Sequence, residues 1–234
     1  MLNTQNAIFN WSGGKDSSLC LYQVLNDTKY LVRCLVTTLN GQNNRVSMHG
    51  VHENLLGQQA KAIGIPLKKV YLPESPDMET YNKIFTDFLN QMKNENINTS
   101  IFGDIFLEDL RKYREEQLAK IGFTAAFPLW GKKTSLVAND FIQKGFKAII
   151  VSVDSRYLDK SFAGRIYDES FLNDLPANVD PCGENGEFHS FVFDGPIFKT
   201  PVIFEKGEIV YKEYKSHSKE NPDENIGFWY CDLK

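Results

Sequence analysis

Six consecutive residues near the start of the chain carry the groups that a phosphate-binding turn needs: Ser12-Gly13-Gly14-Lys15-Asp16-Ser17. Glycines let the backbone approach a ligand closely, and the free N–H groups at a helix N-terminus carry a partial positive charge. Lys15 adds a full charge, and serine hydroxyls can donate hydrogen bonds to phosphate oxygens. An apolar run, Ala7–Trp11, precedes the motif and a helical pattern follows it, so we expect the motif to join a strand to a helix.

The competing interpretation of this motif is a tight turn without a ligand, in which Asp16 or Ser17 caps the helix. The residues themselves exclude two better-known nucleotide loops. A Walker A loop needs glycine five residues before its Gly-Lys pair and Ser or Thr directly after the lysine. Phe9 and Asp16 occupy these two places, and the dinucleotide pattern G-x-G-x-x-G is absent as well.

A glycine-rich stretch in the second half, Asp180–His189, holds another group of reactive side chains. Its carboxylates, Glu184 and Glu187, could enter one pocket and hold a cation, such as ammonium or trimethylammonium, or take a proton from an attacking amine. The alternative is a polar turn with solvated carboxylates. His189 could serve the same pocket as a base or a donor, or it could be a strand histidine bonded to backbone.

Asp104 is the candidate metal ligand. It follows a buried strand, next to the expected phosphate loop, and Mg²⁺ usually takes one or two carboxylates together with phosphate oxygens. A helix N-cap is the alternative role for Asp104. Zinc is disfavoured, because the pair His49 and His52 has no cysteine or histidine cluster at the spacing of a zinc site.

Two further features have simple interpretations. Cys182 could be a nucleophile, but it lacks a partner cysteine nearby in the sequence. A mixed-charge helix face is expected to be solvated and consists of Arg111, Lys112, Arg114, Glu115 and Glu116.

Strands and helices alternate through the first two thirds of the chain. This alternation predicts βαβ units, and hence a mostly parallel sheet with ligands at the carboxyl ends of its strands. The expected strands are 7–11, 31–39, 67–72, 100–103, 123–127 and 146–153, and the expected helices are 16–25, 52–63, 78–93, 107–121 and 134–144.

After about residue 154 the character of the sequence changes, with more glycine and proline. Short strands are expected at 191–193, 201–204, 208–211 and 227–230, with a turn at Lys206-Gly207 and a surface loop at 216–225. We therefore predict a nucleotide-binding α/β domain over residues 1–104 and a substrate-binding α+β domain over residues 105–234.

The composition is that of an ordinary globular protein, with 42% apolar and 24% charged residues. The formal net charge of −4 makes nucleic acid an unlikely partner, and no apolar run is long enough for a membrane helix. The N-terminus is not typical of a signal peptide. Four widely spaced cysteines suggest a reduced, cytoplasmic chain.

The hexapeptide resembles the S-G-G-x-D-S loop of the N-type ATP pyrophosphatases, or PP-loop enzymes. Later segments are similar, in order and content, to the diphthine–ammonia ligase family: Gly103-Asp104-Ile105, Phe127–Gly131, Asp180–His189 and Phe191–Pro196. The resemblance covers nearly the whole chain, and the run Gly183–Phe188 is its most specific part. Asp104 stands where archaeal and eukaryotic members have a small residue, so the resemblance is nearest to a bacterial branch.

The resemblance implies an HUP-type, five-stranded parallel sheet with helices on both faces, and a loop that grips the β- and γ-phosphates of ATP while the α-phosphorus is attacked. It implies ATP and Mg²⁺ as cofactors, and it places Met48 and His49 near the adenine. The expected reaction joins ammonia to a small-molecule or protein-borne carboxylate, with release of AMP and pyrophosphate. Lys15, Asp16, Glu184, Glu187 and His189 are the expected catalytic residues, and a homodimer is possible.

Two rival functions stay open at this point. A PP-loop tRNA-modifying thiolase would need a basic RNA surface and paired cysteines, and the sequence has neither. A sensor that holds an adenine nucleotide without turnover is not excluded by the sequence. The acceptor also stays open, since bacteria lack diphthamide on their elongation factor.

Overall fold

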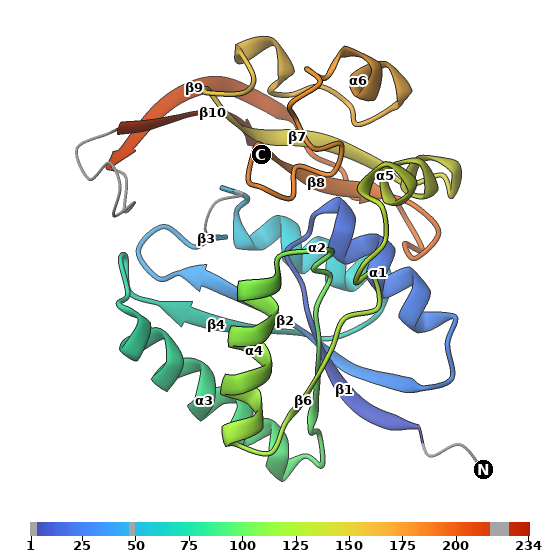
Figure 1. Cartoon of the computed structure of the whole chain (residues 1–234), viewed down its shortest axis with the longest axis vertical. Coiled ribbons are helices and arrows are strands. Elements are labelled where there is room, and N and C mark those ends of the chain that lie inside the picture. Colours follow the sequence, from blue (N-terminus) through green and yellow to red (C-terminus); the bar gives the residue numbers. More distant parts are fainter. Residues whose placement is uncertain (1–3, 47–49, 216–224) are drawn as a thin grey trace.

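A parallel sheet dominates the first half of the chain in the computed structural model, which describes residues 4–46, 50–215 and 225–234 (Figure 1). Parallel pairing runs in the order β4, β2, β1, β5, β6, and the short β3 lies antiparallel to the end of β2. These strands are β1 (Gln5–Asn10), β2 (Tyr30–Asn40), β3 (Arg45–Val46), β4 (Leu67–Leu72), β5 (Thr99–Ile101) and β6 (Thr124–Ala126). The predicted five-stranded parallel sheet is thereby confirmed.

Helices cover both faces of this sheet, as predicted. Side chains of β1 alternate between two apolar layers: Ala7 and Phe9 pack on the side of α1 and α2, and Ile8 packs on the side of α3 and α4. The helices are α1 (Lys15–Leu25), α2 (Glu53–Ile63), α3 (Met78–Asn94) and α4 (Glu108–Lys120). Among the described residues, no helix is both long enough and apolar enough to cross a bilayer.

An antiparallel sheet forms the second half, with strand order β8-β7-β10-β9. Figure 1 shows it lying across the α1 and α2 side of the first sheet, with α6 on its far side. Both halves contribute to one apolar core, so the two sheets are packed together rather than tethered. The elements are α5 (Thr134–Gln143), β7 (Lys147–Asp154), α6 (Glu169–Asp174), β8 (Phe188–Asp194), β9 (Lys206–Lys215) and β10 (Asn225–Leu233), with a short 3₁₀ helix at Lys160–Phe162.

Two local predictions in the second half are wrong. Residues 201–204 form no strand, because their pairing is limited to one backbone bond, from Val202 N–H to the Phe193 carbonyl at 2.7 Å. Lys206 and Gly207 are not a turn but the start of β9, where Lys206 pairs with Leu233. The predicted surface loop lies almost wholly outside the described residues.

The division of the chain at residue 104 stays a prediction. The elements just after that residue, α4 and β6, belong to the first sheet and its helical cover, because β6 pairs with β5 from Thr99 to Ile101. In the structure, α5 is the first element that belongs to the mixed second half.

Phe171 offers a test of the packing on the far side of the second sheet. It is fully buried, and its ring centroid lies 5.2 Å from that of Phe188 and 5.5 Å from that of Tyr167. Phe171→Ala should lower the free energy of unfolding by about 3–5 kcal/mol, because the surrounding rings cannot fill the cavity. Urea denaturation measures the loss. Leu136→Ala, on the exposed face of α5, is the control and should change stability by less than about 1 kcal/mol. Equal losses in both variants would contradict this packing.

Candidate active site

A cavity of about 570 Å³ lies where the strand ends of the first sheet meet the second sheet. Its walls come from the phosphate-loop motif, the ends of β1, β2 and β5, the helices α3 and α4, and the glycine-rich turn 180–187. Eight of the predicted site residues line it: Ser12, Gly14, Lys15, Asp16, Ser17, Asp104, Glu184 and His189. Gly13 and Glu187 are outside the lining, and Met48 and His49 lie outside the described residues.

The phosphate loop is shaped by its own hydroxyl groups at the N-terminus of α1. Gly14 is the N-cap residue, so neither Asp16 nor Ser17 caps the helix. The Ser17 hydroxyl donates to the Gly14 carbonyl at 2.9 Å, and the Gly14 N–H donates to the Ser12 hydroxyl at 3.2 Å. The Ser12 hydroxyl lies 3.0 Å from that of Ser17. The loop thus presents hydroxyls and an N–H at a helix N-terminus, an arrangement that suits an anion.

The Lys15 ammonium connects the loop to the glycine-rich turn. The side chain is only 4% exposed, its Nζ lies 2.7 Å from Asp16 Oδ2, and it donates a hydrogen bond to the Cys182 carbonyl. The rings of Phe188 and Tyr167 lie 5.4 and 5.7 Å from Nζ. Burial lowers the pKa of Lys15, but the Asp16 carboxylate and the other polar neighbours outweigh it and leave the pKa raised. Lys15 therefore stays charged inside the protein.

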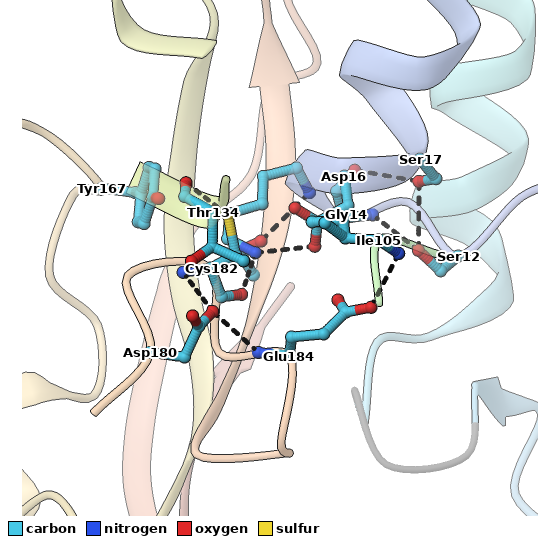
Figure 2. A network of polar contacts seen from close by, with 12 residues as sticks. Ser12, Gly14, Asp16, Ser17, Ile105, Thr134, Tyr167, Asp180, Cys182 and Glu184 are labelled. Atoms are coloured by element: carbon cyan, nitrogen blue, oxygen red, sulfur yellow. Dashed lines mark hydrogen bonds and ion pairs between the residues drawn. The ribbon is translucent and has the colours of Figure 1, made fainter. Parts of the chain in front are cut away.

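Three carboxylates, those of Asp16, Asp104 and Glu184, line the cavity. Glu184 Oε1 accepts a hydrogen bond from the Ile105 N–H at 2.9 Å, as Figure 2 shows. Burial, and then the charge of Asp16, raise the pKa of Glu184 to about 7. Burial also raises the pKa of Asp104, although the Arg114 guanidinium, 3.3 Å away, opposes the shift. Glu184 is therefore only partly ionised near neutral pH.

Glu187 has a different position from Glu184. It is 1% exposed and accepts hydrogen bonds from the Asp180 N–H and from the backbone and side-chain N–H groups of Asn185, all at 3.0 Å. These bonds close the turn that carries Glu184. The expectation that both carboxylates enter one pocket thus holds for Glu184 and not for Glu187.

Two residues of β8, His189 and Ser190, line the cavity beside the glycine-rich turn. His189 is half-buried there, and the buried Ser190 hydroxyl accepts a hydrogen bond from the Lys15 N–H at 3.1 Å. Ser190 was missed by sequence reasoning, because its partner lies 175 residues away.

The donor set suits a hard cation bound together with phosphate. Asp16 Oδ1 is buried and accepts no hydrogen bond, and Asp104 Oδ2 meets Arg114 without hydrogen-bond geometry. Such oxygens, next to a phosphate loop, fit the one or two carboxylates that Mg²⁺ takes in proteins. Across the described ranges, no three His, Cys, Asp or Glu side chains are grouped for a metal held by protein alone.

Arg114 is a cavity residue that the sequence misassigned. The solvated-face prediction is correct for the exposed Lys112, Glu115 and Glu116 but wrong for Arg114, whose guanidinium lies 4.2 Å from the Phe102 ring centroid. Arg111 likewise lies over the Trp130 ring at 4.6 Å. The sequence did offer a signal: the two arginines are three residues apart, which puts them on one face of the helix, and an aromatic-rich segment is available for them to stack on.

The remaining cavity wall is apolar. Between α3 and α4 it consists of Tyr81, Phe85, Leu89, Leu110 and Leu118, with Asn82, Tyr113 and Gln117 at its polar edge. Such a wall suits a flat or apolar group joined to a charged one.

The cysteines offer no nucleophile. All four are buried and free, and the Cys182 thiol donates to the Thr134 carbonyl at 3.3 Å. Burial raises the pKa of Cys182 far above its usual range, so the thiolate form is suppressed. His52 caps α2 by accepting from the Asn54 N–H at 3.2 Å.

The raised pKa of Glu184 predicts a pH-dependent stability. Folded Glu184 keeps its proton up to about pH 7, whereas the unfolded chain releases it near pH 4.5, so the free energy of unfolding must fall as pH rises between these values. Glu184→Gln removes this contribution. We expect the melting temperature of the wild type to drop more between pH 5 and pH 8 than that of the variant. Glu116→Gln, on the exposed face of α4, should follow the wild type, and identical slopes for all three proteins would contradict the assignment.

Comparison with known proteins finds diphthine–ammonia ligases among sequence relatives and a tRNA thiolase among solved structures. The diphthine–ammonia ligase of Danio rerio is 25% identical over 230 residues, which cover 85% of this chain and 86% of that enzyme. The same enzyme of Schizosaccharomyces pombe is 26% identical over 130 residues, and the match covers 50% of this chain but 22% of that longer protein. Among solved structures, the U34-tRNA thiolase NcsA from Methanococcus maripaludis is 16% identical with a TM-score of 0.37, covering 61% of this chain and 59% of its own.

Family profiles agree with these relatives. The diphthamide synthase N-terminal domain matches residues 5–124, and the diphthamide synthase C-terminal domain matches residues 133–220. The two profiles span most of the chain, including the phosphate loop and the glycine-rich turn. This chain therefore belongs to the diphthamide synthase family, the family of the diphthine–ammonia ligases.

Proposed function

We propose that this ATP-dependent, amide-forming ligase of the diphthine–ammonia ligase family adenylates a substrate carboxylate in the cavity and transfers the acyl group to ammonia. One observation carries the proposal: the phosphate loop and the near-neutral carboxyl of Glu184 line the same cavity. The carboxylate oxygen attacks the α-phosphorus and pyrophosphate leaves. Ammonia then attacks the acyl carbon, forming the C–N bond as AMP departs.

Pyrophosphate is held by the loop in this proposal. The Gly14 N–H and the hydroxyls of Ser12 and Ser17 supply donors at the positive end of α1, where charge develops on the leaving group. Lys15 adds a buried charge beside them, and Gly13 allows the loop its turn with a φ of +78°. The protein thereby contributes positioning and charge neutralisation.

Asp16 and Asp104 would hold Mg²⁺ in this proposal, because their carboxylates border the loop and carry oxygens without hydrogen bonds. When bound, Mg²⁺ supplies charge neutralisation for the phosphate oxygens. Arg114 keeps Asp104 oriented toward the cavity through their ion pair.

Glu184 is the proposed base for the amine. Ammonium must lose a proton before nitrogen can attack, and a carboxyl with a pKa of about 7 can take a proton and release it again near neutral pH. The Ile105 N–H fixes one oxygen of the carboxylate, which leaves the other for the amine. His189 borders the same space as a second hydrogen-bonding group, and Glu187 supports Glu184 through the turn.

Several finer points are part of the same proposal. Met48 and His49 are proposed to lie near the adenine, the acceptor is a carboxylate on a small molecule or a protein, and the protein acts in the cytoplasm, with a homodimer as the proposed assembly. The thiolase alternative has little support, since the cysteines are buried. A nucleotide sensor is distinguished from the ligase by turnover.

The products test the reaction. Incubation with Mg²⁺-ATP, ammonium and a panel of carboxylic acids, diphthine on its elongation factor among them, should give AMP and pyrophosphate in equal amounts with an accepted acid. Little turnover is expected without the acid, because the carboxylate is the attacking group. Chromatography of the nucleotides and a pyrophosphate assay measure both products. ADP and phosphate as main products would overturn the mechanism, and no turnover with any acid would favour the sensor.

Glu184→Gln tests the role of the base. Glutamine preserves an oxygen that accepts from Ile105 N–H but cannot take a proton, so amide formation should fall by about 10²–10⁴-fold. ATP affinity, measured by calorimetry, should change little. Glu187→Gln is the comparison variant: it places an NH₂ group where the turn requires an acceptor, and a lower melting temperature is expected. If Glu184→Gln lost ATP binding as severely as amide formation, Glu184 would belong to the ATP site and not to the acceptor site.

A further inference from the structure

Gln59 is a fully buried polar residue of α2 for which the reaction described above has no role. Its side chain is 0% exposed, yet both N–H donors and the carbonyl oxygen of its amide are hydrogen-bonded. Nε2 donates to the Gly13 carbonyl at 3.0 Å and to the Val192 carbonyl at 2.6 Å, and Oε1 accepts from Trp11 Nε1–H at 2.9 Å. The orientation of the amide is fixed by these partners, because two are acceptors and one is a donor.

One of these bonds holds the peptide group between Gly13 and Gly14. The Gly13 carbonyl accepts from Gln59 and also from the Val192 N–H at 2.9 Å, so its oxygen is held away from the cavity. A trans peptide is planar, and its N–H points opposite to its C=O. The Gly14 N–H is therefore directed to the cavity side, where it meets the Ser12 hydroxyl at 3.2 Å.

The close approach of Gln59 also explains why glycine occupies position 13. A Cβ there would lie 2.8 Å from Gln59 Oε1, and the φ of +78° already disfavours any other residue. The contact pair of Gly13 and Gln59 thus fixes the backbone of the loop from behind, without touching a ligand.

We propose that Gln59 is a positioning residue that sets the Gly14 N–H toward the β- and γ-phosphates and fastens the phosphate loop to β8 through Val192. This proposal rests on the proposed function, in that the loop is taken to hold pyrophosphate. If Gln59 only filled the core, substituting it would lower stability and weaken the binding of all ligands alike. A positioning glutamine affects the ligands that contain the outer phosphates.

Gln59→Glu is the informative substitution, because it keeps the shape and removes the N–H donors. At pH 8.5 the carboxylate faces the Gly13 and Val192 oxygens and repels both, so binding of ATP and of pyrophosphate should weaken about tenfold or more. Binding of AMP, which lacks the outer phosphates, should stay within about threefold. At pH 6 the buried carboxyl regains a proton that it can donate, and affinity for ATP and pyrophosphate should recover toward the wild type.

Calorimetric titrations of the full chain with ATP, pyrophosphate and AMP at both pH values measure these effects. Gln58→Glu is the matched control: it makes the same chemical change at the neighbouring, exposed position of α2, and it should leave all three affinities unchanged. Gln59→Met cannot donate a hydrogen bond at any pH, so it should weaken the binding of ATP and pyrophosphate, but not of AMP, at both pH values. This variant replaces Gln59→Glu in the test if Gln59→Glu does not fold.

The outcomes separate the two proposals. Equal weakening of AMP and pyrophosphate binding, or no recovery of Gln59→Glu at pH 6, would overturn the positioning role of Gln59. A wild-type chain that binds neither ATP nor pyrophosphate would instead overturn the proposed function.

Discussion

A buried positive charge is the constraint on which the site depends. Removing an ammonium group from water costs several kcal/mol, and around Lys15 this cost is offset by the Asp16 carboxylate, the Cys182 carbonyl and two aromatic faces. Cys182 lies 167 residues from Lys15 in the sequence. The loop and the glycine-rich turn can therefore satisfy their charges only when both halves of the chain are folded and packed.

The carboxylates of the cavity bring negative charge to the same place. Burial raises the pKa of both Asp104 and Glu184, and the nearby charge of Asp16 raises both pKa values further. A polyphosphate brought to this place would add negative charge to negative charge. A divalent cation that enters with the phosphate relieves the conflict, which is the physical argument for Mg²⁺ here.

Much of the first half could be predicted from the sequence, because its pattern is local. The mostly apolar run at 7–11, the helical periods and the stop at Gly64 each depend on neighbours within a few residues, and the structure has the corresponding elements. The phosphate motif was accessible for the same reason, since motif and context lie side by side, whereas the pocket position of Glu184 rested on the resemblance of Asp180–His189 to the family.

The errors concern contacts that residue spacing along the chain does not reveal. Glu187 was expected in the pocket because spacing alone cannot show that Asp180 and Asn185 enclose it. Arg114 was expected in solvent because Phe102 and Asp104 come from another element. Gln59 showed no signal at all, since its partners lie 46 and 133 residues away. The bacterial placement and the division at residue 104 stay predictions.

The order of the second sheet has one more consequence. Of its two outer strands, β8 is covered by the phosphate loop and α2 near Val192. β9 is exposed along most of its length and, within the described part of the chain, has no strand on its outer side. An open strand edge invites pairing with another chain. This edge strand carries five charged residues: Lys206, Glu208, Lys212, Glu213 and Lys215. Each would have to give up water if another strand paired there, so these charges disfavour open-ended growth of the sheet by edge-to-edge pairing.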